Sequence, residues 1–308
     1  MQSKPQALSK SPQPIPLPSL KQMEKSVTKC LPRRNKAKNI PETNRKGTAG
    51  LRRAIAIPTQ QRPSPLPVSF IIPTKTMSCI LHIETSTDVC SVALSQDGVC
   101  LHEEIDTNGR RHAEILAPFV EEAVSFADSH AIPLDAVSVS AGPGSYTGLR
   151  IGVSTAKGLC YGRDLKLISI PTLKVLCTPI LLYREDIPDN ALLCPMIDAR
   201  RMEVYTAIYD RALHEVLPTD AVIVNENSFA EILDKQPVFF FGNGADKCRD
   251  TLKHPNAHFI EGIVPKASNM LPLAERALAL NETEDVAYYE PFYLKQFVAG
   301  KSRNLLNG

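Results

Sequence analysis

A glycine-rich segment, SAGPGSYTGLRIGVSTAKGL at residues 140–159, contains residue types that can bind an anion. Gly142 and Gly144 flank Pro143 where a strand is predicted to end, so the backbone can turn sharply and direct its N–H groups outward at the start of a helix. Such N–H groups bind phosphate, which makes this turn a candidate nucleotide or phosphate site. The alternative is that the glycines only allow the strand and the helix to pack closely.

A second candidate phosphate site lies in the segment IETSTD, in a predicted turn between two strands. Thr85, Ser86 and Thr87 lie there between Glu84 and Asp88. Hydroxyls and carboxylates in such a turn can hold phosphate or magnesium, although the same residue types are ordinary turn formers.

Charged side chains elsewhere give no catalytic arrangement. Asp198, Arg200, Arg201 and Glu203, in IDARRMEVY, can bind an anion or can form a solvated strand edge. His112 follows two arginines, with no second ligand or nucleophile nearby, and is expected at the surface of a helix start. The eight cysteines are scattered without CxxC pairs, which indicates a reducing compartment and no zinc site. We therefore predict no catalytic residue and no bound metal.

Two predicted helices carry faces suited to a partner protein. Gly148, Gly152 and Ala156 recur at intervals of four, which places small residues on one face where another helix can approach closely. The preceding helix carries an apolar stripe at helical spacing. We expect a partner interface formed by Ile115, Leu116, Phe119, Val120, Gly148, Gly152 and Ala156.

The elements that position these residues are predicted to form two related α/β halves around a cleft. Residues 80–170 read as βββαβαβ, with a hairpin turn at Asp97-Gly98 and helices over 112–127 and 147–159. A shorter series follows from about residue 190. It has strands at LLCPMID, MEVYTAIY, AVIV and VFFFG and helices at SFAEILD and LAERALALN.

Residues 1–76 differ in composition from the rest of the chain. They hold 15 of the 35 Lys and Arg, 2 of the 33 Asp and Glu, 12 of the 25 Pro and a single aromatic, Phe70. We expect this segment to be disordered, and we favour a start site assigned too early over a transit peptide or an arm that binds nucleic acid. The predicted domains are then the tail 1–76, a first subdomain 77–180 with the partner-binding helices, and a smaller second subdomain 181–308.

A family resemblance covers about residues 79–297 and leaves the tail outside. The combination of IETST, NGRRHAEILAPFV, GPGSYTGLRIGVSTAKGL and IDARRMEVYTAIY resembles the TsaB (YeaZ) family of bacterial proteins. The segment PFYLK is similar to the Pro-x-Tyr-Leu-Lys/Arg ending of that family. The long glycine-rich motif is the most specific of these segments.

The resemblance implies an actin-like fold of the sugar kinase and Hsp70 class and a role in making threonylcarbamoyladenosine on tRNA. TsaB is understood as the non-catalytic paralogue of TsaD, which transfers the threonylcarbamoyl group from its adenylate to the adenosine beside the anticodon. TsaD binds a metal through a His-x-x-x-His pair, whereas Lys174 and Thr178 occupy the matching positions here and cannot replace it. Gly242 and Gly244, in GNGA, match the place where actin-like proteins hold adenosine.

The favoured function is a non-catalytic subunit that binds TsaD and works with TsaE, meeting tRNA only through the complex. No cofactor is expected to bind tightly, with ATP or ADP at the complex interface, and the free protein can form a homodimer. We expect a cytoplasmic protein that binds no membrane. One alternative is a stand-alone actin-like enzyme, either a metallopeptidase or a kinase. The missing His pair argues against a peptidase, and a kinase needs a base carboxylate and two phosphate loops. A nucleotide-binding module without a partner is the other alternative.

Overall fold

The computed structural model describes residues 78–109 and 111–295, which lie in one compact unit, Ile71–Gly308. The predicted disorder of residues 1–76 and the start at Met77 lie outside the described residues and stay predictions. None of the helices in the described ranges is long and apolar enough to cross a membrane.

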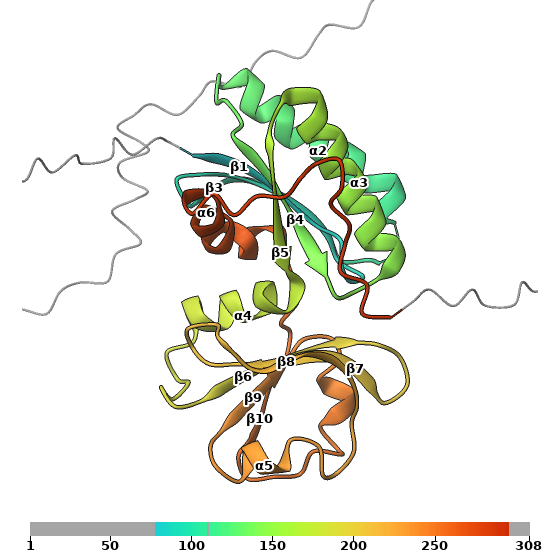
Figure 1. Ribbon diagram of the computed structural model, residues 1–308, viewed down its shortest axis with the longest axis vertical. Coiled ribbons are helices and arrows are strands. Elements are labelled where there is room, and N and C mark those ends of the chain that lie inside the picture. The colour runs from blue at the N-terminus through green and yellow to red at the C-terminus, as the bar shows by residue number, and fades with distance from the viewer. Residues whose placement is uncertain (1–77, 110, 296–308) are drawn as a thin grey trace, which may run out of the picture. The chain divides into compact units, whose positions relative to one another are not determined.

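The first five strands form one mixed sheet in the order β3-β2-β1-β4-β5 (Figure 1). Strand β2 is antiparallel to β1 and β3, whereas β4 runs parallel to β1 and β5. Asp97 and Gly98 have φ angles of 51° and 75° and form the predicted β2–β3 hairpin turn. The order βββαβαβ is confirmed by β1 (Cys79–Glu84), β2 (Cys90–Gln96), β3 (Val99–Asp106), α2 (His112–Ser129), β4 (Ala136–Gly142), α3 (Tyr146–Arg163) and β5 (Lys166–Pro171).

Helices cover both faces of the first sheet (Figure 1). Leu116 of α2 and Val153 of α3 belong to one hydrophobic cluster with Leu81 of β1. On the other face, Ala274 of α6 (Leu271–Ala279) packs in a cluster with Ile80 of β1. Because β1 is buried on both sides, its sequence CILHIE is apolar almost without a break.

His82 is the polar exception inside β1. Its side chain is fully buried, with Nδ1 at 2.7 Å from the Ser138 hydroxyl and Nε2 at 2.8 Å from the Ser95 hydroxyl. Burial lowers the pKa of His82 to about 3, so the imidazole is neutral at physiological pH. Both ring nitrogens are hydrogen-bonded inside the sheet, so His82 is a structural residue.

The second sheet repeats the topology of the first. Its order is β10-β9-β6-β7-β8, and its central strand β6 is antiparallel to β7 and parallel to β9, as β1 is to β2 and β4. This match confirms the prediction of two related α/β halves. The elements are β6 (Leu192–Asp198), β7 (Glu203–Tyr209), β8 (Glu215–Ile223), α5 (Ala230–Leu233), β9 (Val238–Phe241) and β10 (Ala257–Ile260).

Helix α4 (Thr172–Tyr183) is a buried element that was not predicted. Leu173 and Leu176 pack in the cluster of the second sheet, whereas Val175 packs in a cluster of the first. A helix that is apolar on nearly all sides has no amphipathic period, which explains why the sequence pattern did not reveal it.

The C-terminal part of the described chain returns to the first sheet. The Glu284 N–H donates to the Leu167 carbonyl at 2.8 Å, and the Phe292 N–H donates to the Ala141 carbonyl at 2.7 Å. Residues of the predicted second subdomain, 181–308, therefore pack on the first sheet. The predicted boundary at residue 180 stays a prediction.

Candidate functional site

The glycine-rich turn packs directly on the β1–β2 turn. The Ser145 N–H donates to the Ser86 carbonyl at 2.6 Å. A Cβ atom at Gly144 would overlap the Ser86 carbonyl oxygen, and one at Gly148 would overlap the Thr85 carbonyl oxygen. The alternative role predicted for these glycines, close packing of strand and helix, accounts for both positions.

The three residues predicted to bind phosphate through their hydroxyls are buried beside this contact. Thr85 and Ser86 are fully buried and Thr87 is 7% exposed. The Thr85 hydroxyl donates to the Gly148 carbonyl at 2.9 Å, and the Ser86 hydroxyl donates to Glu84 Oε1 at 2.5 Å. The Thr85 and Ser86 hydroxyls therefore donate hydrogen bonds within the chain. Phosphate binding at Thr85, Ser86 and Thr87 stays a prediction.

Gly142 contacts the returning C-terminal segment. Its φ is +102°, and a Cβ there would lie 2.5 Å from the Phe292 carbonyl oxygen, so a larger residue would displace this segment. A cavity of about 280 Å³ adjoins the turn. Its lining is Ala141, Gly142, Pro143, Pro171, Leu173, Glu215, Thr219 and Phe292.

Glu84 is a buried carboxyl beside the glycine-rich turn. Its Oε1 accepts from the Ser86 N–H at 2.6 Å, whereas Oε2 has no partner among the described residues. Burial raises the pKa of Glu84 to about 7, and the hydrogen bonds from Ser86 oppose this only in part. The carboxyl therefore exchanges its proton near neutral pH.

We expect Glu84→Gln to remove a pH dependence of stability. Because the folded-state pKa is raised, the folded chain binds this proton more tightly than the unfolded chain, so stability falls as pH rises from 4.5 to about 7. The free energy of unfolding should decrease by about 3 kcal/mol across this window through Glu84 alone. Guanidinium unfolding of both proteins at about pH 4.5 and pH 8 measures the difference, and identical pH slopes would contradict this prediction.

The residues predicted to form the partner interface lie on the inner face of α2 and α3, against the first sheet, and their role in an interface stays a prediction. Leu116 and Ala156 are at most 1% exposed, and a Cβ at Gly152 would overlap the Thr85 hydroxyl oxygen. Val120 and Gly148 are buried as well, and Ile115 and Phe119 are half-buried against the same core. When a helix covers a sheet, its apolar stripe packs against that sheet.

A second stripe of small residues on α3 points to solvent. It consists of Ser154, Gly158 and Gly162. These three residues and the neighbouring Tyr161, all of them exposed, are here called the outer face of α3. Nothing lies within 4 Å of a Cβ placed at Gly158 or Gly162, and Tyr161 is 87% exposed. Each glycine inside a helix costs about 1 kcal/mol relative to alanine. The sequence prediction missed this stripe, although its spacing of four was visible.

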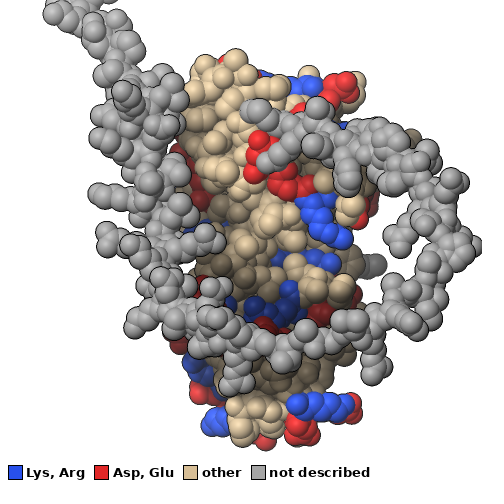
Figure 2. Space-filling model, turned by 90° about the vertical axis from the view of Figure 1, so that its left-hand side faces the viewer, with Lys and Arg blue, Asp and Glu red and all other residues tan. Residues whose placement is uncertain are grey.

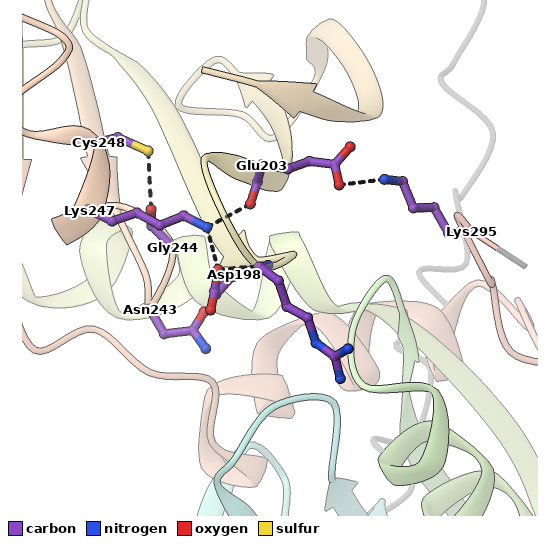
Figure 3. Close-up of polar contacts among 8 residues, drawn as sticks. Asp198, Glu203, Asn243, Gly244, Lys247, Cys248 and Lys295 are labelled. Carbon is purple, nitrogen blue, oxygen red and sulfur yellow. Dashed lines mark hydrogen bonds and ion pairs between the residues drawn. The ribbon is translucent and has the colours of Figure 1, made fainter. Parts of the chain in front are cut away.

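The GNGA turn packs on the end of β6, and Figure 3 shows Asn243 and Gly244 of this turn near Asp198. Cβ atoms at Gly242 and Gly244 would overlap the β6 backbone at Met196 and Ile197 respectively. The Asn243 side-chain carbonyl accepts from the Asp198 N–H at 3.0 Å. These glycines therefore allow close backbone packing, and their role in nucleotide binding stays a prediction.

Two of the charged residues in IDARRMEVY have lysine partners (Figure 3). The Asp198 carboxylate contacts the Lys247 ammonium, which also donates to the Glu203 carbonyl at 2.7 Å. The Glu203 carboxylate contacts the Lys295 ammonium. Neither carboxylate is free to act as a base in this arrangement.

The remaining candidates for chemistry lie in structural positions. His112 is 7% exposed, with Nε2 at 3.2 Å from the Val89 carbonyl, so the expectation of a surface residue is wrong. Thr178 donates to the Lys174 carbonyl at 3.3 Å within α4. Within residues 78–109 and 111–295, no three His, Cys, Asp or Glu side chains are grouped to hold a metal. The prediction of no bound metal remains open.

Comparisons with known proteins give a matching family model, curated relatives and similar solved structures. The family model described as TsaD, tRNA N6-adenosine threonylcarbamoyltransferase, matches residues 105–301. The tRNA threonylcarbamoyladenosine biosynthesis protein TsaB of Escherichia coli is 31% identical over 228 residues, covering 72% of this chain and 96% of that protein. Its namesake from Haemophilus influenzae is 28% identical over 235 residues, covering 72% and 95%. YeaZ from Pseudomonas aeruginosa superimposes with a TM-score of 0.57 at 27% identity, covering 71% of this chain and all of YeaZ.

Proposed function

We propose that this chain, which belongs to the TsaB family of tRNA threonylcarbamoyladenosine biosynthesis proteins, is a non-catalytic subunit that binds and supports TsaD. The family resemblance and the actin-like fold expected from the sequence are both confirmed. The outer face of α3 carries the remainder of the proposal, namely that the chain acts through a partner.

The outer face of α3 has the properties of a helix-packing surface. Gly158 and Gly162 are one helical turn apart, which lets the backbone of another helix approach to the short end of the usual 8–10 Å range. Tyr161 adds a large apolar side chain with a polar tip, a residue type enriched at protein interfaces. Since no contact within the described chain explains the two glycines, we assign them to the contact with TsaD.

A stand-alone enzyme is the weaker reading of this structure. A kinase needs a carboxylate that can accept the proton of the substrate hydroxyl and loops that hold the phosphates. Glu84 is fully buried, and the β1–β2 and glycine-rich turns pack on each other through Ser86 and Ser145. The relatives named TsaB support the subunit role and not the enzyme.

The finer partner assignments belong to the same proposal. We assign TsaE as a further member of the complex, tRNA as a substrate met through the complex, and ATP or ADP as nucleotides at its interface. We also assign a homodimer to the free protein and a cytoplasmic location to the complex.

Co-purification with TsaD tests the proposal. Tagged TsaD from the same organism, expressed with this full chain, should retain it in a fixed molar ratio through size-exclusion chromatography. A tagged chain that elutes apart from TsaD at micromolar concentrations would contradict the subunit role.

A further inference from the structure

The turn between β6 and β7 carries two consecutive arginines in an unusual backbone conformation. Arg200 has a φ of 72° and Arg201 a φ of 50°, and both residues are exposed. Residues other than glycine rarely adopt positive φ, and Asn or Gly are favoured where it is needed. The backbone therefore does not favour arginine here, which points to a role for the two side chains.

A network of hydrogen bonds holds this turn in place (Figure 3). Asp198 Oδ1 accepts from the Arg200 N–H at 2.9 Å, and the Asp198 N–H donates to Asn243 at 3.0 Å. Lys247 contacts both the Asp198 carboxylate and the Glu203 carbonyl. Residues of β6, of β7 and of the GNGA turn thus hold this turn. The backbone from which the two arginine side chains extend is therefore fixed.

Both carboxylates of this network pair with lysines and not with Arg200 or Arg201. Asp198 is balanced by Lys247 and Glu203 by Lys295. No ion pair joins the guanidinium of Arg200 or Arg201 to a carboxylate among the described residues. Residues 77–308 hold 20 Lys and Arg against 31 Asp and Glu, and side chains of both charges are visible on the face in Figure 2. Arg200 and Arg201 are therefore two adjacent cations without an ion-pair partner among the described residues, in a part of the chain whose net charge is negative.

An open hollow with a mixed polar and apolar lining begins at Met202, which directly follows Arg201. The Met202 carbonyl accepts from the Val224 N–H at 2.8 Å. The hollow measures about 460 Å³ and is lined by Met202, Val224, Asn225, Glu226, Asn227 and Thr251. Its amides and hydroxyl suit the hydroxyls of a sugar and the edges of a base, whereas Glu226 repels phosphate.

We propose that this turn binds the backbone of an RNA strand, with neighbouring phosphates on Arg200 and Arg201 and the intervening nucleoside against the hollow. The planar guanidinium forms paired hydrogen bonds with phosphate oxygens. A free nucleotide is the less suitable ligand, because small-molecule sites are concave and enclose most of the ligand, whereas this hollow is open. The identification of the RNA as tRNA rests on the proposed function, whereas the contact itself does not. This direct contact goes beyond the indirect role in tRNA binding assigned above.

Residue-resolved protection of the full chain tests this contact. Phenylglyoxal modifies accessible arginines, and mass spectrometry reports each site separately, so the 15 Lys and Arg of residues 1–76 do not obscure the result. Unfractionated tRNA should slow modification of Arg200 and Arg201 several-fold. It should leave Arg184 and Arg249, which pair with Asp186 and Glu261, unchanged.

A double variant provides the quantitative test. Arg200→Asn with Arg201→Gly removes both cations while supplying the residues that favour positive φ, so the turn should fold at least as well. The matched control, Arg184→Gln with Arg249→Gln, removes the same charge elsewhere. The logarithmic salt dependence of tRNA binding should become about 1.4 to 1.8 less steep in the turn variant and stay near the wild-type value in the control.

Three results would overturn the RNA contact. They are equal salt slopes in the two variants, no protection of Arg200 and Arg201, and protection by ATP or inorganic phosphate equal to that by tRNA. None of them bears on TsaD binding, which the co-purification measures separately. If the chain binds TsaD but gives any of these three results, the RNA contact is wrong and the proposed function still stands.

Discussion

Gly152→Leu is expected to destabilise the fold severely. Gly152 lies on the inner face of α3, where a Cβ would overlap the Thr85 hydroxyl oxygen and lie 3.4 Å from the Thr85 Cβ. The Thr85 hydroxyl donates to the Gly148 carbonyl, so moving the helix away also breaks this buried bond. Overpacking costs about 1–3 kcal/mol and a lost buried hydrogen bond about 1–3 kcal/mol more. We expect the melting temperature to fall by roughly 10 °C or more, or the variant to be insoluble.

Gly158→Leu on the same helix is the matched control for this effect. A Cβ at Gly158 meets open space, and leucine is a better helix former than glycine by about 0.8 kcal/mol. Its melting temperature should therefore equal or slightly exceed that of the wild type. Differential scanning calorimetry measures both variants. If the melting temperature of Gly152→Leu equalled that of the wild type, Gly152 would not face the sheet as described.

Gly158→Leu is expected to weaken TsaD binding about 5- to 150-fold. The branched side chain would hold a partner helix away from the outer face of α3, and overpacking at a close contact costs about 1–3 kcal/mol. Gly158→Ala should raise stability by about 1 kcal/mol and weaken binding less. Isothermal titration calorimetry of each folded variant with TsaD measures these affinities.

Ala279→Leu is the binding control for that prediction. Ala279 is an exposed small residue at the end of α6, on the opposite side of the first sheet from α3. Its replacement should leave the affinity for TsaD unchanged. Wild-type affinity in Gly158→Leu would place the contact on another surface, and equal losses in both variants would mean that surface leucine itself interferes.

The regular first half of the fold was predictable because its elements carry clear local signals. Strand β1 is a short apolar run, Asp97-Gly98 marks the hairpin, and α2 has a helical apolar period. Helix α4 was missed because it is buried between elements of both sheets and shows no polar face. The return of the chain through α6 to the first sheet depends on long-range packing that no local pattern encodes.

The partner contact that we propose lies on a helix that the sequence also indicated, α3, but on the opposite face of that helix. Helix α3 carries two sets of small residues at intervals of four, one including Gly152 and one including Gly158. Leu149 and Val153 lie next to the first set and are buried with it, so neighbouring apolar residues were the available signal. The contact of the glycine-rich turn with Ser86 could not be predicted from local sequence patterns, since it joins residues nearly 60 positions apart in the chain.

Reconstituted tRNA modification tests the central claim most directly. Purified TsaD, TsaE, threonylcarbamoyl adenylate and unmodified tRNA would be incubated with and without this full chain, and threonylcarbamoyladenosine would be quantified by mass spectrometry. A parallel reaction would contain this chain as the only protein. We predict product only when TsaD and this chain are both present. Product from this chain alone, or an equal yield from TsaD and TsaE without it, would contradict its role as a non-catalytic subunit that supports TsaD.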